Sequence, residues 1–258
     1  IGNGVGISAF APPNLLIGGT AAGAGNVISG NAGSGIALAA APNALVQGNL
    51  IGTQKDGISP LGNGGSGVAL GFQTGGAFGG GPDTIGGTVA GARNTIAFNG
   101  AAGIHAIVGF FGGSGSAGQG QHTILGNSIF SNGGLGIDLG GVGPNDTGDA
   151  DGGINSGQNF PTITSVTNGG GNTAIAGTLN SNASTNYRIE FFANDAIDPS
   201  GFGEGQTFLG FVNVTTNASG NASFNASFPQ IAAGKRVTST ATNANARPPS
   251  FQERPVSS

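Results

Sequence analysis

The chain has 258 residues, of which 55 are glycine and only 7% are charged, and its formal net charge is −4. Its seven scattered basic residues cannot build the positive stripe that follows a phosphate backbone, so we expect no nucleic-acid partner. Cysteine is absent, which excludes disulfides and Cys-ligated metals, and no apolar run is long enough to predict a membrane span. The opening residues I-G-N-G-V-G-I look like the middle of a repeat, so we expect a mature chain or a piece of a longer one.

One phrase recurs four times within residues 1–143. In each copy an Asn is followed, five positions later, by an Ile or Val that comes directly after a Gly. These β-branched residues, counted from Ile7, are 29, 32, 36 and 33 positions apart, and periods of this size indicate stacked repeats. The repeated residues are Asn31, Asn63, Asn99 and Asn132, and Ile36, Val68, Ile104 and Ile137.

A second phrase, N-x-I-x-x-N, precedes three of these copies and begins at Asn26, Asn94 and Asn127. The short apolar phrases alternate like strands, and Gly and Asn stand where tight bends need positive φ. Three short strands per repeat describe one coil of a parallel β-helix, so residues 1–143 are predicted to form four to five coils. The β-branched residues should stack inside, and the Asn amides should form a hydrogen-bonded ladder at the corners.

Four longer stretches carry a resemblance to a known class of proteins. They are I-G-G-T-A-A-G-A-G-N-V-I-S-G-N (17–31), G-N-L-I-G-T (48–53), I-G-G-T-V-A-G-A-R-N-T-I (85–96) and N-S-I-F-S-N-G-G-L-G-I-D-L (127–139). They resemble right-handed parallel β-helix repeat proteins of large bacterial secreted and cell-surface polypeptides, and the later residues resemble the terminal β-sandwich-like module of that group. The resemblance implies an extracellular or cell-surface location, a scaffold or adhesin-like role, and no assigned catalytic residues.

The second half of the chain has a different texture. Residues 144–160 form a polar connector rich in Gly, Asp and Asn, and residues 161–246 contain alternating strand patterns separated by turns such as N-G-G-G. Such spacing predicts a small antiparallel Ig-like β-sandwich. Residues 247–258 depart from the related module and are expected to be a tail.

Two groups of residues are candidate sites. Eight of the eleven acids fall between positions 138 and 204, where Arg188 is the only base, and this excess of negative charge favours cation binding. A calcium site is one interpretation, because close-spaced oxygens lie on a Gly-rich loop; a solvated connector is the other. The candidate ligands are Asp146, Asp149, Asp151 and Asn155.

The second candidate is an outward pair, His105 and Asp138, which should be neighbours in adjacent coils at about 4.8 Å. An acid–base pair is one interpretation, and a surface hydrogen bond or weak ion pair is the other, since no nucleophile accompanies them.

The sequence thus predicts a non-enzymatic extracellular scaffold or adhesin that contacts itself or surface glycans. End-to-end pairing of coils into filaments is one version of this prediction. A carbohydrate-binding or carbohydrate-cleaving module is the alternative, although the coils hold few of the carboxylates that cleavage needs.

Overall fold

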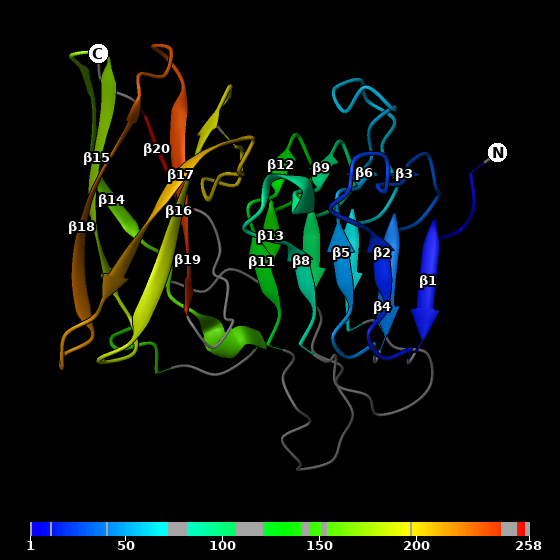
Figure 1. Ribbon diagram of the computed structural model, residues 1–258, viewed down its shortest axis with the longest axis horizontal. Coiled ribbons are helices and arrows are strands. Elements are labelled where there is room, and N and C mark those ends of the chain that lie inside the picture. The colour runs from blue at the N-terminus through cyan, green and yellow to red at the C-terminus, as the bar shows by residue number, and fades with distance from the viewer. Residues whose placement is uncertain are drawn as a thin grey trace.

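The computed structural model describes residues 2–10, 12–39, 41–71, 82–106, 121–140, 145–150, 154–196, 198–243 and 252–255. Within them the chain is all-β, apart from the short 3₁₀ turns η1 (Ala90–Ala92) and η2 (Ile154–Gly157). Neither turn has the length and hydrophobicity that a helix needs to cross a membrane. Figure 1 shows two units side by side, a stack of short parallel strands and a pair of antiparallel sheets.

The first unit, which we call the parallel stack, contains three parallel sheets. Each sheet takes every third strand of the chain, so one pass along three strands makes one coil, an arrangement compatible with a parallel β-helix. Sheet A is β1 (Ile7–Phe10), β4 (Ile36–Ala39), β7 (Val68–Leu70), β10 (Ile104–Ala106) and β13 (Ile137–Asp138). Sheet B is β2 (Leu16–Gly18), β5 (Leu45–Gln47), β8 (Thr84–Gly86) and β11 (Thr123–Leu125). Sheet C is β3 (Val27–Ile28), β6 (Leu50–Ile51), β9 (Thr95–Ala97) and β12 (Ser128–Phe130).

The predicted interior column runs through sheet A in register. Ile36 pairs with Val68, Val68 with Ile104, and Ile104 with Ile137, and at least 97% of each residue is buried. Sheets B and C add their own columns of buried Ile and Val to the same core. At the end of β2, Gly18 has φ of 86°, and a Cβ there would collide with the carbonyl oxygen of Gln47 in the next coil. The close coil spacing therefore requires glycine at this bend.

The second unit, which we call the sandwich unit, consists of two antiparallel sheets that share one core. One sheet has the order β14-β15-β18, with bounds β14 (Thr162–Gly169), β15 (Asn172–Asn180) and β18 (Asn221–Pro229). The other has the order β17-β16-β19-β20, with bounds β16 (Asn186–Asn194), β17 (Thr207–Thr215), β19 (Arg236–Asn243) and β20 (Gln252–Pro255). Ile175 and Phe224 from the first sheet pack with Ile189, Phe191 and Val237 from the second.

Two segments differ from the sequence interpretation. The expected tail contains β20, which pairs with β19 in antiparallel register, because the exposed edge of β19 offers ladder hydrogen bonds. The connector is folded onto its neighbours instead of being solvated throughout. Asn145 and Phe160 exchange two hydrogen bonds across it, and Asp149 is 94% buried.

Candidate functional site at the end of the parallel stack

Two columns of asparagine side chains run along the parallel stack. In the first column, Nδ2 of each Asn donates to Oδ1 of the Asn one coil further on, at 2.8 to 2.9 Å. Each Oδ1 also accepts the backbone N–H of the same donating Asn. The members are Asn31, Asn63, Asn99 and Asn132. The predicted Asn ladder is therefore confirmed.

The second column has the same geometry, and three of its four members begin the N-x-I-x-x-N phrase; the fourth, Asn49, begins the variant N-L-I-G-T. Its members Asn26, Asn49, Asn94 and Asn127 are joined at 2.9 to 3.0 Å. Asn49, Asn94 and Asn127 are at least 98% buried. Amides hidden this deeply need a partner for each polar atom, so both columns fix the register between coils.

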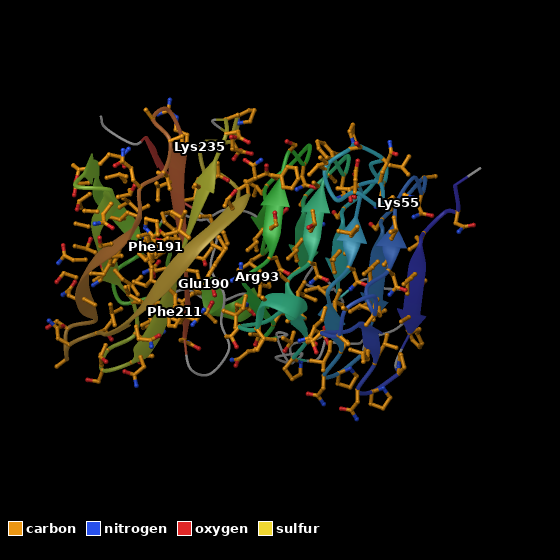
Figure 2. The ribbon with its side chains drawn as sticks, turned by 45° about the horizontal axis from the view of Figure 1, so that its top comes forward. Lys55, Arg93, Glu190, Phe191, Phe211 and Lys235 are labelled. Carbon is orange, nitrogen blue, oxygen red and sulfur yellow. The ribbon has the colours of Figure 1, made fainter. Side chains whose placement is uncertain are left out.

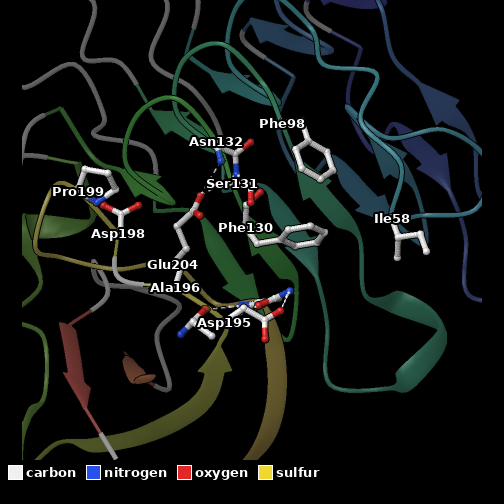
Figure 3. A pocket seen from close by; sticks show the side chains of 12 residues that line it. Ile58, Phe98, Phe130, Ser131, Asn132, Asp195, Ala196, Asp198, Pro199 and Glu204 are labelled. Carbon is white, nitrogen blue, oxygen red and sulfur yellow. Dashed lines mark hydrogen bonds between the residues drawn. The ribbon is translucent and has the colours of Figure 1, made fainter. Parts of the chain in front are cut away.

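A ladder in which every Nδ2 donates forward needs an acceptor after its last member. Glu204, from the loop between β16 and β17, supplies that acceptor for the first column. Its Oε1 accepts both the backbone N–H and the Nδ2 of Asn132, at 3.1 and 2.9 Å. Figure 3 shows this carboxylate pointing at Asn132. The column therefore ends on a carboxyl group of the sandwich unit.

Glu190 of β16 performs a matching role near the end of the second column. Its Oε2 accepts the backbone N–H of Gly126, the residue before Asn127, at 2.8 Å. Its Oε1 accepts from Arg188 Nε at 2.8 Å, and the Glu190 side chain is 99% buried. Arg188 in turn lies over the ring of Phe211, with Cζ 3.4 Å from the ring centroid. Glu190 thus joins the last coil of the stack to Arg188 of the sandwich unit through one carboxyl group.

The third corner of the coils holds different polar residues. Asp83 accepts the backbone N–H of Ala44 at 3.0 Å, and His122 Nδ1 lies 3.2 Å from Asp83 Oδ2. Asn155 of the connector completes the series, because its amide bonds both the N–H and the C=O of His122. All three polar side chains are at least 98% buried. This corner therefore also ends on a residue from beyond the stack.

Apolar contacts cover the same end. Phe192 of β16 belongs to the core of the parallel stack, with Phe208 of β17 packed against it. The guanidinium of Arg93 lies 4.0 Å from the Phe208 ring centroid. Ile129 and Gly205 exchange backbone hydrogen bonds at 2.8 and 2.9 Å, which extends the edge of sheet C. The sandwich unit thus closes the end of the stack with apolar and polar contacts together.

Strand β16 achieves this by its alternation. Tyr187, Ile189 and Phe191 face the core of the sandwich unit, whereas Glu190 and Phe192, on the opposite face, contact the parallel stack. Figure 2 shows Glu190 between the two units and Phe191 among the sandwich strands. One strand therefore contributes to two cores.

Burial raises the pKa of Glu204 above its ordinary value of 4.5, and the nearby negative charge of Asp198 acts in the same direction. The hydrogen bonds from Asn132 oppose this shift but do not cancel it. Glu204 therefore holds its proton more tightly in the folded protein than in the unfolded chain.

A cavity of about 500 Å³ adjoins Glu204 and is lined from both units. Phe98 and Phe130, from adjacent coils, form an edge-to-face pair with ring centroids 5.4 Å apart. Phe98 has φ of 60°, whereas Gly30 stands at the equivalent corner of an earlier coil, with φ of 71°. A bulky side chain in this region costs about 1–3 kcal/mol, so the ring is retained against local strain.

The described members of the predicted calcium group are bonded to protein partners. Asp149 accepts from Asn159 N, Ser181 Oγ and Asn182 Nδ2, at 2.6 to 3.1 Å, while Asn155 is bound to His122. Asp146 accepts from the backbone of Ala150, and Asp151 lies outside the described residues. Among the residues that the structure does describe, no three His, Cys, Asp or Glu side chains form a metal-binding group.

The predicted outward pair is brought together. His105 and Asp138 are paired in sheet A, and His105 Nε2 lies 3.6 Å from Asp138 Oδ2. Both side chains are partly exposed, at 32% and 24%, and Asp138 also accepts the N–H of Gly140. This geometry is that of a weak, partly exposed polar contact between paired strands.

Sequence reasoning did not assign roles to Glu190 and Glu204. One signal in the sequence is the excess of acids between positions 138 and 204, which by itself favours a cation site. A second signal is the segment Y-R-I-E-F-F-A (187–193), where an acid and an aromatic share the face opposite the apolar one. A scan against models of protein families and a search of curated protein sequences gave no match to this chain.

Proposed function

We propose that the chain is a segment of an extracellular or cell-surface scaffold of the right-handed parallel β-helix class, with an Ig-like sandwich closing the stack. Its role is spacing and adhesion. The observation that supports this most is that two acids of the sandwich unit bond the last coil of the stack: Glu204 ends the first asparagine column at Asn132, and Glu190 accepts the buried N–H of Gly126 beside the second. Such bonds hold the two units in one orientation, as a load-carrying or surface-presenting rod requires.

The proposal excludes catalysis by these acids. Glycoside cleavage needs two carboxyl groups that can exchange protons with a bound sugar and its attacking water. Glu190 is engaged by Arg188 and Gly126, and Glu204 by two donors of Asn132. Both acids serve the structure.

We propose that the chain self-associates as a closed dimer and not as a filament. A filament made by stacking coils head to tail needs open strand edges at both ends of the stack. The end at β12 is covered by Gly205, so we place the proposed contact on the opposite face of the described stack, where Phe10, Leu16 and Val27 are more than half exposed. Pairing of two like ends with a second copy gives a closed dimer and no filament.

Small-angle X-ray scattering and electron microscopy, combined with a reducing-sugar assay on a panel of polysaccharides, test the proposal. We expect elongated monomers or two-fold dimers and no release of reducing ends. Release of reducing ends that disappears in Glu204→Gln would overturn the scaffold assignment. Long filaments would overturn the closed-dimer form of self-association.

A further inference from the structure

We propose that the cavity beside Glu204 is a carbohydrate-binding subsite that accepts a neutral or amino sugar ring. This inference rests on the proposed adhesive function and specifies its ligand class. The cavity, of about 500 Å³, has the size of a small-ligand site and lies where two units meet, a common place for such sites.

One wall of the cavity is apolar and comes from the parallel stack. It consists of Ile58, Phe98 and Phe130, and Ile58 is 72% exposed. Both aromatic rings are partly exposed. Figure 3 shows Ile58 and the two rings around the same hollow. An aromatic face carries partial negative charge, so it attracts the weakly positive C–H face of a pyranose ring.

The strain at Phe98 adds to this argument. The corner before the ladder Asn is occupied by the small residues Gly30 in an earlier coil and Ser131 in the next, with φ of 71° and 55°. At Phe98 the same backbone region carries a bulky aromatic side chain. The Phe98 ring lines the cavity, whereas Ile96 of the same coil fills the core of the stack. A binding role therefore accounts for an aromatic residue at a backbone conformation that disfavours it.

The opposite wall is polar and already organised. Asp195 and Gln206 exchange two hydrogen bonds, at 2.7 and 2.9 Å, and Lys235 Nζ contacts Asp195 Oδ1. The Asp195 side chain is 60% exposed, so its oxygens can accept further donors from a ligand. Sugar hydroxyls are such donors, and a preorganised acceptor loses little freedom on binding them.

The charge of the site narrows the ligand class. Asp195, Asp198 and Glu204 line the cavity, and Lys235 pairs with the first of them. The surplus of carboxylates repels uronic and sialic acids and favours neutral or amino sugars. An exposed carboxylate at Asp195 opposite an aromatic wall matches the polar and apolar faces of a sugar ring better than an extended apolar peptide.

Isothermal titration calorimetry of the full chain tests the subsite. The probes are tetrasaccharides of glucose, of N-acetylglucosamine and of galacturonic acid. We expect at least one neutral probe to bind and the galacturonate probe to fail. Phe98→Gly should weaken binding about ten-fold or more while the protein still unfolds cooperatively, because glycine accepts the local backbone. The control Phe211→Ala removes a partly exposed ring outside the cavity and should leave the affinity unchanged.

Asp195→Asn gives a second readout, since it removes charge without changing shape. It should weaken the neutral probe and reduce the discrimination against galacturonate. The subsite is refuted if no neutral probe binds, if Phe98→Gly binds as well as the original chain, or if a lysine-rich peptide binds there instead. None of those results refutes the scaffold proposal. Release of reducing ends from a polysaccharide refutes that proposal, whereas weak or absent sugar binding does not.

Discussion

The replacement Asn63→Ala tests whether the asparagine columns stabilise the stack. The Asn63 amide makes four hydrogen bonds: two from Asn31, one to Asn99 Oδ1 and one to Ile28 O. Alanine removes all four bonds, and water cannot easily replace them because Asn63 is 99% buried. At about 1 kcal/mol for each lost bond, we expect a loss of about 4 kcal/mol in the free energy of unfolding.

The matched control is Asn26→Ala, which removes the same amide from the exposed start of the second column. The Asn26 side chain donates one hydrogen bond, to Asn49 Oδ1, so the expected loss is below about 1 kcal/mol. Urea unfolding followed by far-ultraviolet circular dichroism measures both values, with unchanged m-values as the check on comparable transitions. Equal losses in the two variants would show that a buried middle Asn stabilises the stack no more than an exposed first one. This would refute the stabilising role of the buried amide bonds.

Three further outcomes are expected. Because the pKa of Glu204 is raised, its contribution to stability is complete below the unfolded pKa near 4.5 and is lost as pH rises through the folded pKa. Thermal melts across pH should therefore show this decline in the original chain and a flatter profile in Glu204→Gln; identical profiles would contradict the assignment. Glu190→Ala should cost about 3 kcal/mol, since it strands Arg188 and the Gly126 N–H, and amide exchange at Gly126 should accelerate. Chelation should not lower the melting temperature, because protein donors occupy the Asp149 carboxylate, and a clear drop would support the calcium interpretation.

The repeated part of the fold was predictable because one physical requirement recurs in every coil. The spacing from Asn31 to Ile36 recurs at Asn63, Asn99 and Asn132, so register, interior column and ladder follow from the same pattern. The strands of the sandwich unit were likewise visible as alternating segments. At the third corner the equivalent residues are Asp83, His122 and Asn155, and no repeated letter marks their column.

The junction was not predictable in the same way, because its contacts join residues far apart in sequence. Glu204 is 72 positions from Asn132, and Glu190 is 64 positions from Gly126. No local spacing relates them, and composition alone placed the acids in one region. Strand β20 was missed for a related reason, since its pairing with β19 follows from an available edge and not from a strong strand pattern.

The junction also explains why acids stand where the columns end. Phe192 and Phe208 cover the apolar end of the stack core, and this cover limits the access of water to the last coil. The donors of Asn132 and Gly126 would then be buried without partners, at about 1–3 kcal/mol each. A closing strand must therefore offer apolar surface and hydrogen-bond acceptors on one face. Glu190 and Phe192, two positions apart on β16, meet both needs, while the residues between and beside them fill the core of the sandwich unit.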